Sequence, residues 1–184
     1  MRRSGFSKKT PDKDKDLAEK YGEKLTYWRY KGLKGIYWHL ISKYVRLRDF
    51  ISYGTCISCG RKFEKWNEAQ AGHYAPAGNC GFALLFDKRN INAECASCNN
   101  PRFSPGKLIP YRANLVKRYG EEYVKELDEA YSKKTMMKEY SKLEYDREIL
   151  KLQEEIKELE TKLNETNSQH PRSTRQSTKR SKED

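Results

Sequence analysis

Four cysteines in two Cys-x-x-Cys pairs constrain this chain more than any other feature. The first pair is Cys56 and Cys59 in "CISCG", the second is Cys95 and Cys98 in "CASCNN", and 35 residues separate the pairs. Two residues between ligands let both thiolates of a pair reach one ion, and Gly60 favours the tight turn this requires. We therefore predict one structural, tetrahedral Zn²⁺ held by all four thiolates, whose binding replaces much of a hydrophobic core.

The same cysteines allow two other interpretations. They could be buried free thiols, or they could bind an iron–sulfur cluster, which no other feature of the sequence favours. Paired Cys-x-x-Cys motifs indicate metal binding in a reducing compartment rather than disulfides. Cys80 has no such partner and is expected to be a small buried residue rather than a fifth ligand.

Composition indicates a small folded centre with solvated flanks. The chain has 184 residues, of which 35% are charged, and its mean hydropathy is −1.05. No apolar run is long enough to span a membrane, and the basic N-terminus lacks the apolar region of a secretory signal. We therefore expect a cytoplasmic protein.

The charge is strongly asymmetric along the chain. The net charge is +12 in total, with +6 between residues 54 and 119 and −5 between residues 120 and 168. A basic excess concentrated around the cysteines favours nucleic acid as the partner, although a basic solvated surface is the simpler alternative.

The predicted organisation has an α+β core between helical flanks. It comprises a disordered basic arm (1–16), an N-terminal helical segment (17–53), a zinc-bound core (54–120), C-terminal helices (121–166) and a disordered basic tail (167–184). Gly32 and Gly35 are expected to interrupt the N-terminal helical segment. The following amphipathic helix has an apolar stripe at Ile36, Leu40, Tyr44, Leu47 and Ile51.

Three helices are predicted in the C-terminal half of the chain, the first of them at the end of the core. The first follows Pro110 and ends before Gly120, the second covers "EEYVKELDEAY", and the third runs from about Thr135 to Glu165. The third has a short heptad seam at Ile149, Leu152, Ile156, Leu159 and Leu163. About two heptads make a marginal coiled coil, so this seam either dimerises, alone or with the stripe at Ile36, Leu40 and Tyr44, or packs on its own domain.

The segment between the cysteine pairs is too long for a compact zinc ribbon. It predicts a hairpin around "PAGNCG", with His73 on the first arm and Asn90 near the second, then a knuckle and a helix beginning near Asn99. This strand–hairpin–helix order is the layout of a ββα-metal, or HNH, nuclease site. Neutral imidazole at His73 suits a general base near pH 7, and a carbonyl oxygen of Asn99 suits Mg²⁺ or Mn²⁺.

Each of these residues also has a structural interpretation. His73 could be a packed polar residue, Asn99 could cap a helix, and Asn90 could hold the hairpin rather than act in chemistry. His39 is expected on a helix and His170 in the tail, so neither is a candidate for the site.

The segment "CISCG…AGHY…FDKRNINAECASCN…GKLIPYRANLVKRYG" resembles the NinG (Rap) recombination proteins of lambdoid phages, from about Tyr44 to Tyr131. The knuckles also resemble recombination endonuclease VII, in which an asparagine directly follows the last cysteine and binds the catalytic metal. The resemblance implies a metal-dependent HNH endonuclease that cuts branched DNA such as Holliday junctions and D-loops. It also implies a phage or prophage protein in the cytoplasm of a bacterial host. It implies the general-base role for His73 and the metal role for Asn99.

The chain departs from the family pattern at Gly72, where a metal-binding Asp or His often precedes the base. The acidic partner of the metal is left open among Glu68, Asp87 and Glu94. Phosphates are expected to contact Lys43, Arg46, Arg48, Arg61, Lys62, Arg102 and Lys107. A homodimer is expected because a four-way junction offers two symmetric strands to cut. The alternatives are a non-catalytic zinc module that binds nucleic acid, and a sequence-specific, restriction-like nuclease.

Overall fold

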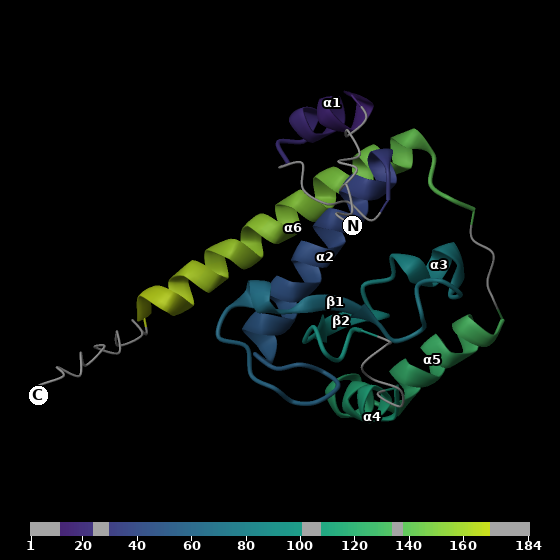
Figure 1. Cartoon of the computed structure of the whole chain (residues 1–184), viewed down its shortest axis with the longest axis vertical. Helices are drawn as coiled ribbons and strands as arrows, with labels where there is room; N and C mark the ends of the chain where they lie inside the picture. The colour runs from purple at the N-terminus through teal and green to yellow at the C-terminus, as the bar shows by residue number, and fades with distance from the viewer. Residues whose placement is uncertain (1–11, 24–29, 101–107, 134–137, 170–184) are drawn as a thin grey trace, which may run out of the picture.

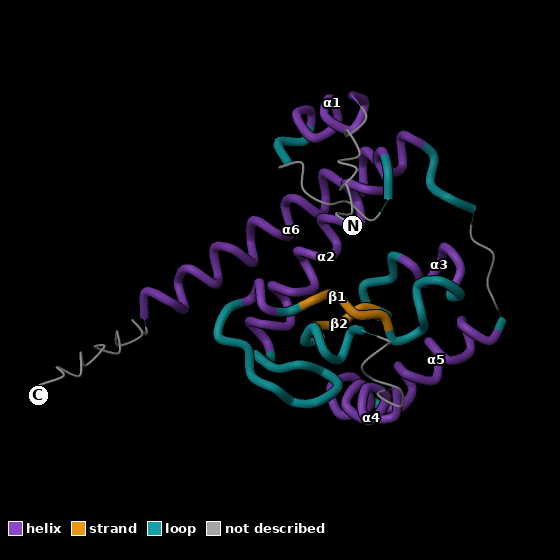
Figure 2. Tube along the Cα trace, in the orientation of Figure 1, coloured by secondary structure: helices purple, strands orange, loops and turns teal. Residues whose placement is uncertain are grey.

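The structure, a computed structural model, describes residues 12–23, 30–100, 108–133 and 138–169. Its elements follow one another as a short helix, a long helix, a two-stranded hairpin with a helical insertion, and three further helices (Figures 1 and 2). They are α1 (Asp12–Lys20), α2 (Gly32–Ser52), the 3₁₀ turn η1 (Trp66–Glu68), β1 (Gln70–His73), α3 (Gly81–Leu85), β2 (Ile91–Glu94), α4 (Leu108–Tyr119), α5 (Glu121–Ser132) and α6 (Lys142–Gln169).

Helices α2 and α6 pack side by side and form the helical layer of the molecule (Figure 1). The apolar stripes of the two helices face each other, since Ile36 and Leu40 on α2 and Ile149 and Leu152 on α6 are all buried. Helix α1 is attached to the same layer, because the side-chain amide of Gln153 on α6 donates to the backbone carbonyl of Tyr21, the residue after α1, at 2.7 Å. The predicted heptad seam is thus covered by the chain's own α2.

The hairpin is a two-stranded antiparallel sheet in which Gln70 pairs with Glu94 and His73 pairs with Ile91. Helix α2 holds it from one side: the Asp49 carboxylate accepts the backbone N–H of Ala93 at 2.6 Å. Helix α4 holds it from the other end of the fold: the Tyr111 hydroxyl donates to the Gly72 carbonyl at 3.0 Å. The hairpin therefore lies between α2 and α4 (Figure 1).

Two hydrophobic clusters stabilise this arrangement. The larger cluster combines residues of α2, α3, α4, α5 and α6. It therefore joins the predicted N-terminal helical segment, the predicted core and the predicted C-terminal helices. The smaller cluster surrounds the cysteines, with Phe63, Ala69 and Ala93 packed against Cys56, Cys95 and Cys98.

Several predicted boundaries were wrong in detail. Gly35 does not interrupt the helix but lies buried inside α2, because the packed environment outweighs the intrinsic cost of glycine. Residues 12–16, predicted to be disordered, belong to α1, and α6 begins at Lys142 rather than near Thr135. The helix α3 between the strands was not predicted, since five residues are too few to show a helical period.

The expected arm and tail lie mostly outside the described residues. Residues 1–11 and 170–184 belong to that part of the chain, as do Arg102 and Lys107. None of the helices in the described ranges carries an apolar stretch of the length needed to cross a bilayer.

Candidate metal centre and hairpin site

The four predicted cysteines meet at one point. Their Sγ atoms all lie within 4.8 Å of one another, and the Sγ atoms of Cys59 and Cys95 are 3.8 Å apart. Tetrahedral zinc with bonds of about 2.3 Å to sulfur requires sulfur–sulfur separations of roughly 3.8 Å. The four thiols therefore form a cluster that fits a metal such as zinc, while Cys80 is buried elsewhere and does not belong to it.

The backbone of each knuckle brings its two thiols together. The N–H of Gly60 donates to the Cys56 carbonyl at 2.9 Å, and the N–H groups of Cys98 and Asn99 both donate to the Cys95 carbonyl. Gly60 adopts a φ of 72°, which a residue with a side chain rarely takes. The knuckles are joined because the Cys95 N–H donates to the Cys56 sulfur at 3.3 Å.

The thiols differ in acidity. Burial raises the pKa of Cys56. Burial also acts to raise the pKa of Cys95, but it is outweighed by hydrogen bonds from Ser97, Cys98 and Cys59, which together lower that pKa to about 6. Thiolates are the metal-binding form of cysteine, so Cys95 is prepared for ligation near neutral pH.

His73 ends strand β1 with its ring held on two sides. Its Nε2 atom lies 2.9 Å from the backbone carbonyl of Leu85, and its ring stacks on Trp38 of α2 with centroids 5.1 Å apart and planes tilted by 16°. A carbonyl oxygen can only accept a hydrogen bond, so this contact selects the neutral tautomer protonated at Nε2. The lone pair of the neutral ring is then on Nδ1, which is the form a general base needs.

Asn90 is fully buried and ties the two arms of the hairpin together. Its side-chain oxygen accepts the N–H of Ala75 at 2.7 Å, and its amide donates to the carbonyls of Ala75 and Leu84. Its backbone carbonyl accepts the N–H of Tyr74 at 2.8 Å. These contacts fix the segment that follows His73, and they occupy the side chain within the fold.

Asn99 lies beside strand β1 on the exit of the second knuckle. Its amide donates to the side-chain oxygen of Gln70 at 2.9 Å. The expectation that Asn99 begins a helix is not met in the described residues, where it follows a turn. Asn99 is therefore held by the knuckle turn rather than by a helix end.

The three acidic candidates have different surroundings. Asp87 is paired with Arg89 at 2.8 Å, and Glu68 is exposed and accepts the N–H of Glu64. Glu94 is only 5% exposed and accepts a hydrogen bond from the hydroxyl of Ser58 in the first knuckle. Of these carboxylates, Glu94 is the one that lies on a strand of the hairpin.

Gly72 makes room for this carboxylate. A Cβ atom added at Gly72 would overlap the Glu94 carboxyl group, so any larger residue would displace it. The missing acidic residue before His73 is thus matched by an acidic side chain from the neighbouring strand.

The strand register separates His73 from Glu94. Side chains alternate between the faces of a strand, so Gln70, Gly72 and Glu94 share one face and His73 points to the other. The structure brings Asn99 to the face of Gln70 and Glu94, and it holds His73 on the face covered by Trp38. Both faces meet at the outer edge of β1, which has no further strand beside it in the described residues.

Comparison with known proteins identifies the family to which the chain belongs. The family model described as Bacteriophage Lambda NinG protein matches residues 4–163. This chain belongs to the NinG family. The chain is 38% identical over 79 residues to Protein ninG of Escherichia phage 933W and 37% identical over 79 residues to that of Escherichia phage lambda, in each case covering 42% of this chain and 36% of the relative.

A third NinG relative, from Salmonella phage P22, is 39% identical over 74 residues, or 40% of this chain and 34% of its own length. The matched region thus spans about a third of the length of these curated relatives. No solved structure matches this chain.

The basic residues expected to contact phosphates are distributed unevenly in this NinG chain. Lys43 pairs with Glu160 at 2.9 Å, and Arg46 donates to the Ser42 carbonyl and lies over the ring of Trp66. Arg48 donates to the carbonyls of Lys88 and Ile91 as well as to Asp49. These α2 cations are engaged within the fold. In contrast, Arg61 and Lys62 are exposed on the first knuckle.

Sequence reasoning missed several residues that shape this site. Trp38, Ser58 and Gln70 contact His73, Glu94 and Asn99 respectively. Trp38 and Gln70 lie outside the motifs that identify the NinG pattern, and Ser58 lies inside "CISCG" but is not one of its expected ligands. Their positions depend on strand register and on the docking of α2, which a single sequence does not specify. The glycine before His73 was the one available signal, because a small residue in a strand often marks a close approach by another group.

Proposed function

We propose that this NinG-family protein is a metal-dependent, HNH-type endonuclease that hydrolyses phosphodiester bonds in branched DNA such as Holliday junctions and D-loops. The observation that carries the proposal is the setting of His73: its Nε2 faces the Leu85 carbonyl and its ring stacks on Trp38. A histidine fixed in one tautomer at the end of β1, in a hairpin whose second strand leads directly into Cys95 of the four-cysteine cluster, is suited to act on water.

In the proposed reaction, Nδ1 of His73 removes a proton from water, and the resulting hydroxide attacks phosphorus. The bond from phosphorus to the leaving oxygen breaks, and that oxygen gains a proton from solvent. Asn99 and Glu94 offer the oxygen atoms that would hold Mg²⁺ or Mn²⁺, which when bound supplies positive charge for the phosphate and the leaving oxygen. Asn90 keeps the hairpin in shape.

The four cysteines have a structural role in this proposal. Four thiolates complete the coordination of zinc and leave no position for a reacting water. The zinc would hold the first knuckle against the second, and through Ser58 it would also hold Glu94. We propose in addition that the active form is a homodimer, which would present two sites to the two strands of a junction.

The second candidate is a non-catalytic zinc module that binds nucleic acid. It is favoured by the register, which directs His73 and Glu94 to opposite faces of the hairpin. The two candidates differ in whether any divalent cation supports cleavage.

The test is cleavage of a labelled four-way junction in Mg²⁺ or Mn²⁺ against EDTA, alongside linear, flap and D-loop substrates. His73→Ala should lower the cleavage rate by ~10²–10⁴-fold with junction affinity nearly unchanged, because a general base acts on the transition state. His39→Ala is the matched control, since His39 pairs with Glu23 away from the hairpin. Cleavage by His73→Ala at the wild-type rate would refute the assignment, and tight binding without cleavage by the wild type would favour the zinc module.

A further inference from the structure

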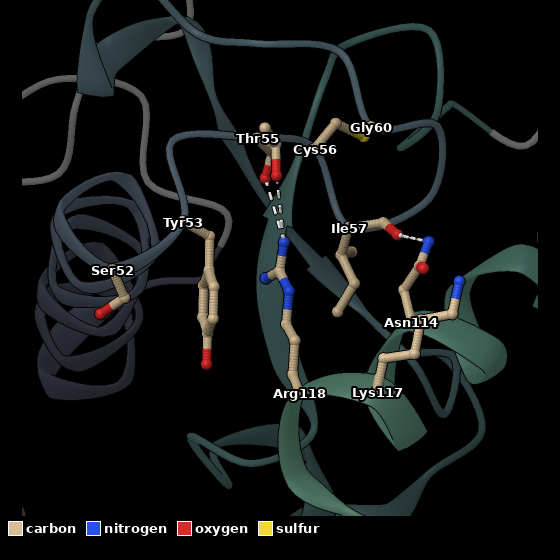
Figure 3. A pocket seen from close by; sticks show the side chains of 9 residues that line it. All are labelled: Ser52, Tyr53, Thr55, Cys56, Ile57, Gly60, Asn114, Lys117 and Arg118. Atoms are coloured by element: carbon tan, nitrogen blue, oxygen red, sulfur yellow. Dashed lines mark hydrogen bonds between the residues drawn. The ribbon is translucent and has the colours of Figure 1, made fainter.

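A cavity of about 420 Å³ lies between the first knuckle and helix α4 (Figure 3). The knuckle contributes Thr55, Cys56 and Gly60, and α4 contributes Asn114, Lys117 and Arg118. Figure 3 shows the α4 side chains extending from the helix toward the knuckle loop. The hairpin site described above does not include this cavity.

The walls of the cavity are fixed by direct contacts. The Asn114 amide donates to the Ile57 carbonyl at 2.6 Å, and an Arg118 Nη donates to the Thr55 carbonyl at 3.3 Å. The Arg118 guanidinium also lies over the ring of Tyr53, 3.9 Å from its centroid. Arg118 is only 10% exposed, so this cation is part of the wall and holds it in place.

The charge around the cavity is positive. Among the described residues that line it, none is acidic. The Asp49 carboxylate, 3.8 Å from Arg118, is fully buried and is already balanced by Arg48 and by a backbone N–H. Lys117 is exposed at the rim. An anion entering here would meet two cations and a threonine hydroxyl.

The basic surface continues beyond the rim. Lys62 pairs with Thr55 across an isolated bridge, and Arg61 directly follows Gly60; both are exposed. A chain of phosphates can use a cavity and its flanking cations together, whereas a single free phosphate uses only the cavity. This continuity is the reason to favour a polymer.

We propose that this cavity binds one phosphate of a DNA backbone through Lys117, with Arg61 and Lys62 contacting its neighbours. The inference rests on the nucleic-acid substrate of the proposed function, but it does not depend on cleavage. Because Cys56 and Gly60 line the cavity, the same inference makes DNA binding at this face depend on the metal-held knuckle.

The test measures binding of a fluorescent four-way junction by anisotropy between 50 and 200 mM salt, in EDTA-free buffer without Mg²⁺ so that no cleavage is needed. Lys117→Gln should weaken binding about 5- to 10-fold near 100 mM salt and reduce the slope of log K against log salt by about 0.9, the value for one phosphate. Lys151→Gln removes the same charge from the exposed side of α6 and serves as control. Lys117→Arg should retain the wild-type slope.

Equal slopes for Lys117→Gln and Lys151→Gln would overturn the proposal. A second measurement separates a polymer from a free anion: the amide NMR signals of Thr55 and Gly60 should shift on adding a short duplex. If inorganic phosphate shifts them equally at the same phosphate concentration, the cavity is a general anion site and the DNA assignment is wrong. If the wild-type protein binds the junction with the expected salt dependence but does not cleave it in Mg²⁺ or Mn²⁺, only the nuclease proposal is contradicted.

Discussion

At the scale of single residues, the pair formed by Gly72 and Glu94 decides how the hairpin is built. The carboxylate occupies the space that a side chain at Gly72 would need, and the Ser58 hydroxyl holds it there. A buried carboxylate is costly unless it is hydrogen-bonded, so this arrangement is sensitive to small changes.

We expect Gly72→Ala to destabilise the protein by about 1–3 kcal/mol, because the new methyl group overpacks against Glu94. Urea unfolding measures the change. Gly78→Ala is the control, since a Cβ at Gly78 would meet nothing within 4 Å. In Gly72→Ala/Glu94→Ala the two effects should be less than additive; full additivity would mean that the two residues do not compete for space.

Trp38 is the second residue whose effect can be predicted. Its ring stacks on His73, and Leu85 fixes the other side of the imidazole. Trp38→Leu should lower cleavage of the junction by about tenfold, while Trp38→Phe should retain most of it because a flat ring can still stack. With only three histidines in the chain, ¹⁵N NMR can report the His73 tautomer directly. An unchanged tautomer and rate in Trp38→Leu would assign Trp38 to packing alone.

At the scale of elements, the cysteine pairs define what the knuckles need. Cys95→Ser should lose the bound metal and the folded knuckles, since metal binding supplies much of the folding free energy of such sites. Cys80→Ser is the matched control because Cys80 is equally buried but lies outside the cluster. Elemental analysis measures the bound zinc, and circular dichroism measures the loss of folded structure. Zinc retained at one equivalent by Cys95→Ser would contradict the four-thiolate site.

The contact between α2 and α6 gives a second element-scale prediction. Leu152→Ala should lower the free energy of unfolding by about 2–5 kcal/mol, because the side chain is 2% exposed against α2. Leu150→Ala, two residues away and 57% exposed, should change it by less than about 0.5 kcal/mol. Denaturant unfolding of both variants measures the difference. Similar values would mean that α6 does not pack on α2 in solution.

The sequence predicted elements well where the signal was local. The cysteine spacing, Pro110 and Gly120 gave the metal cluster and the limits of α4 and the start of α5. The apolar period predicted α6 and its seam, but it could not say what the seam contacts, because an amphipathic face fits a second copy or the same chain equally well. The engaged state of Arg46 and Arg48 was also hidden, since a charge pattern does not show which carbonyls lie nearby.

At the scale of the whole molecule, the position of α6 changes where a dimer can form. Ile149 and Leu152 are buried within one chain, so a homodimer must use another surface. We expect light scattering to find a dimer on a four-way junction, with a contact that does not include the seam. A monomer both free and on the junction would exclude the two-site arrangement.

The pairing of α2 with α6 also has a consequence for biosynthesis. Helix α2 leaves the ribosome early, but its partner is not complete until Lys142–Gln169 has been made. At about 5–20 residues per second, the apolar stripe of α2 waits roughly 5–20 seconds for its cover. The cysteine knuckles, which lie between the two helices in the sequence, are made within that interval. Metal capture can therefore precede closure of the helical layer, and a nascent chain stalled before α6 would be a client for chaperones.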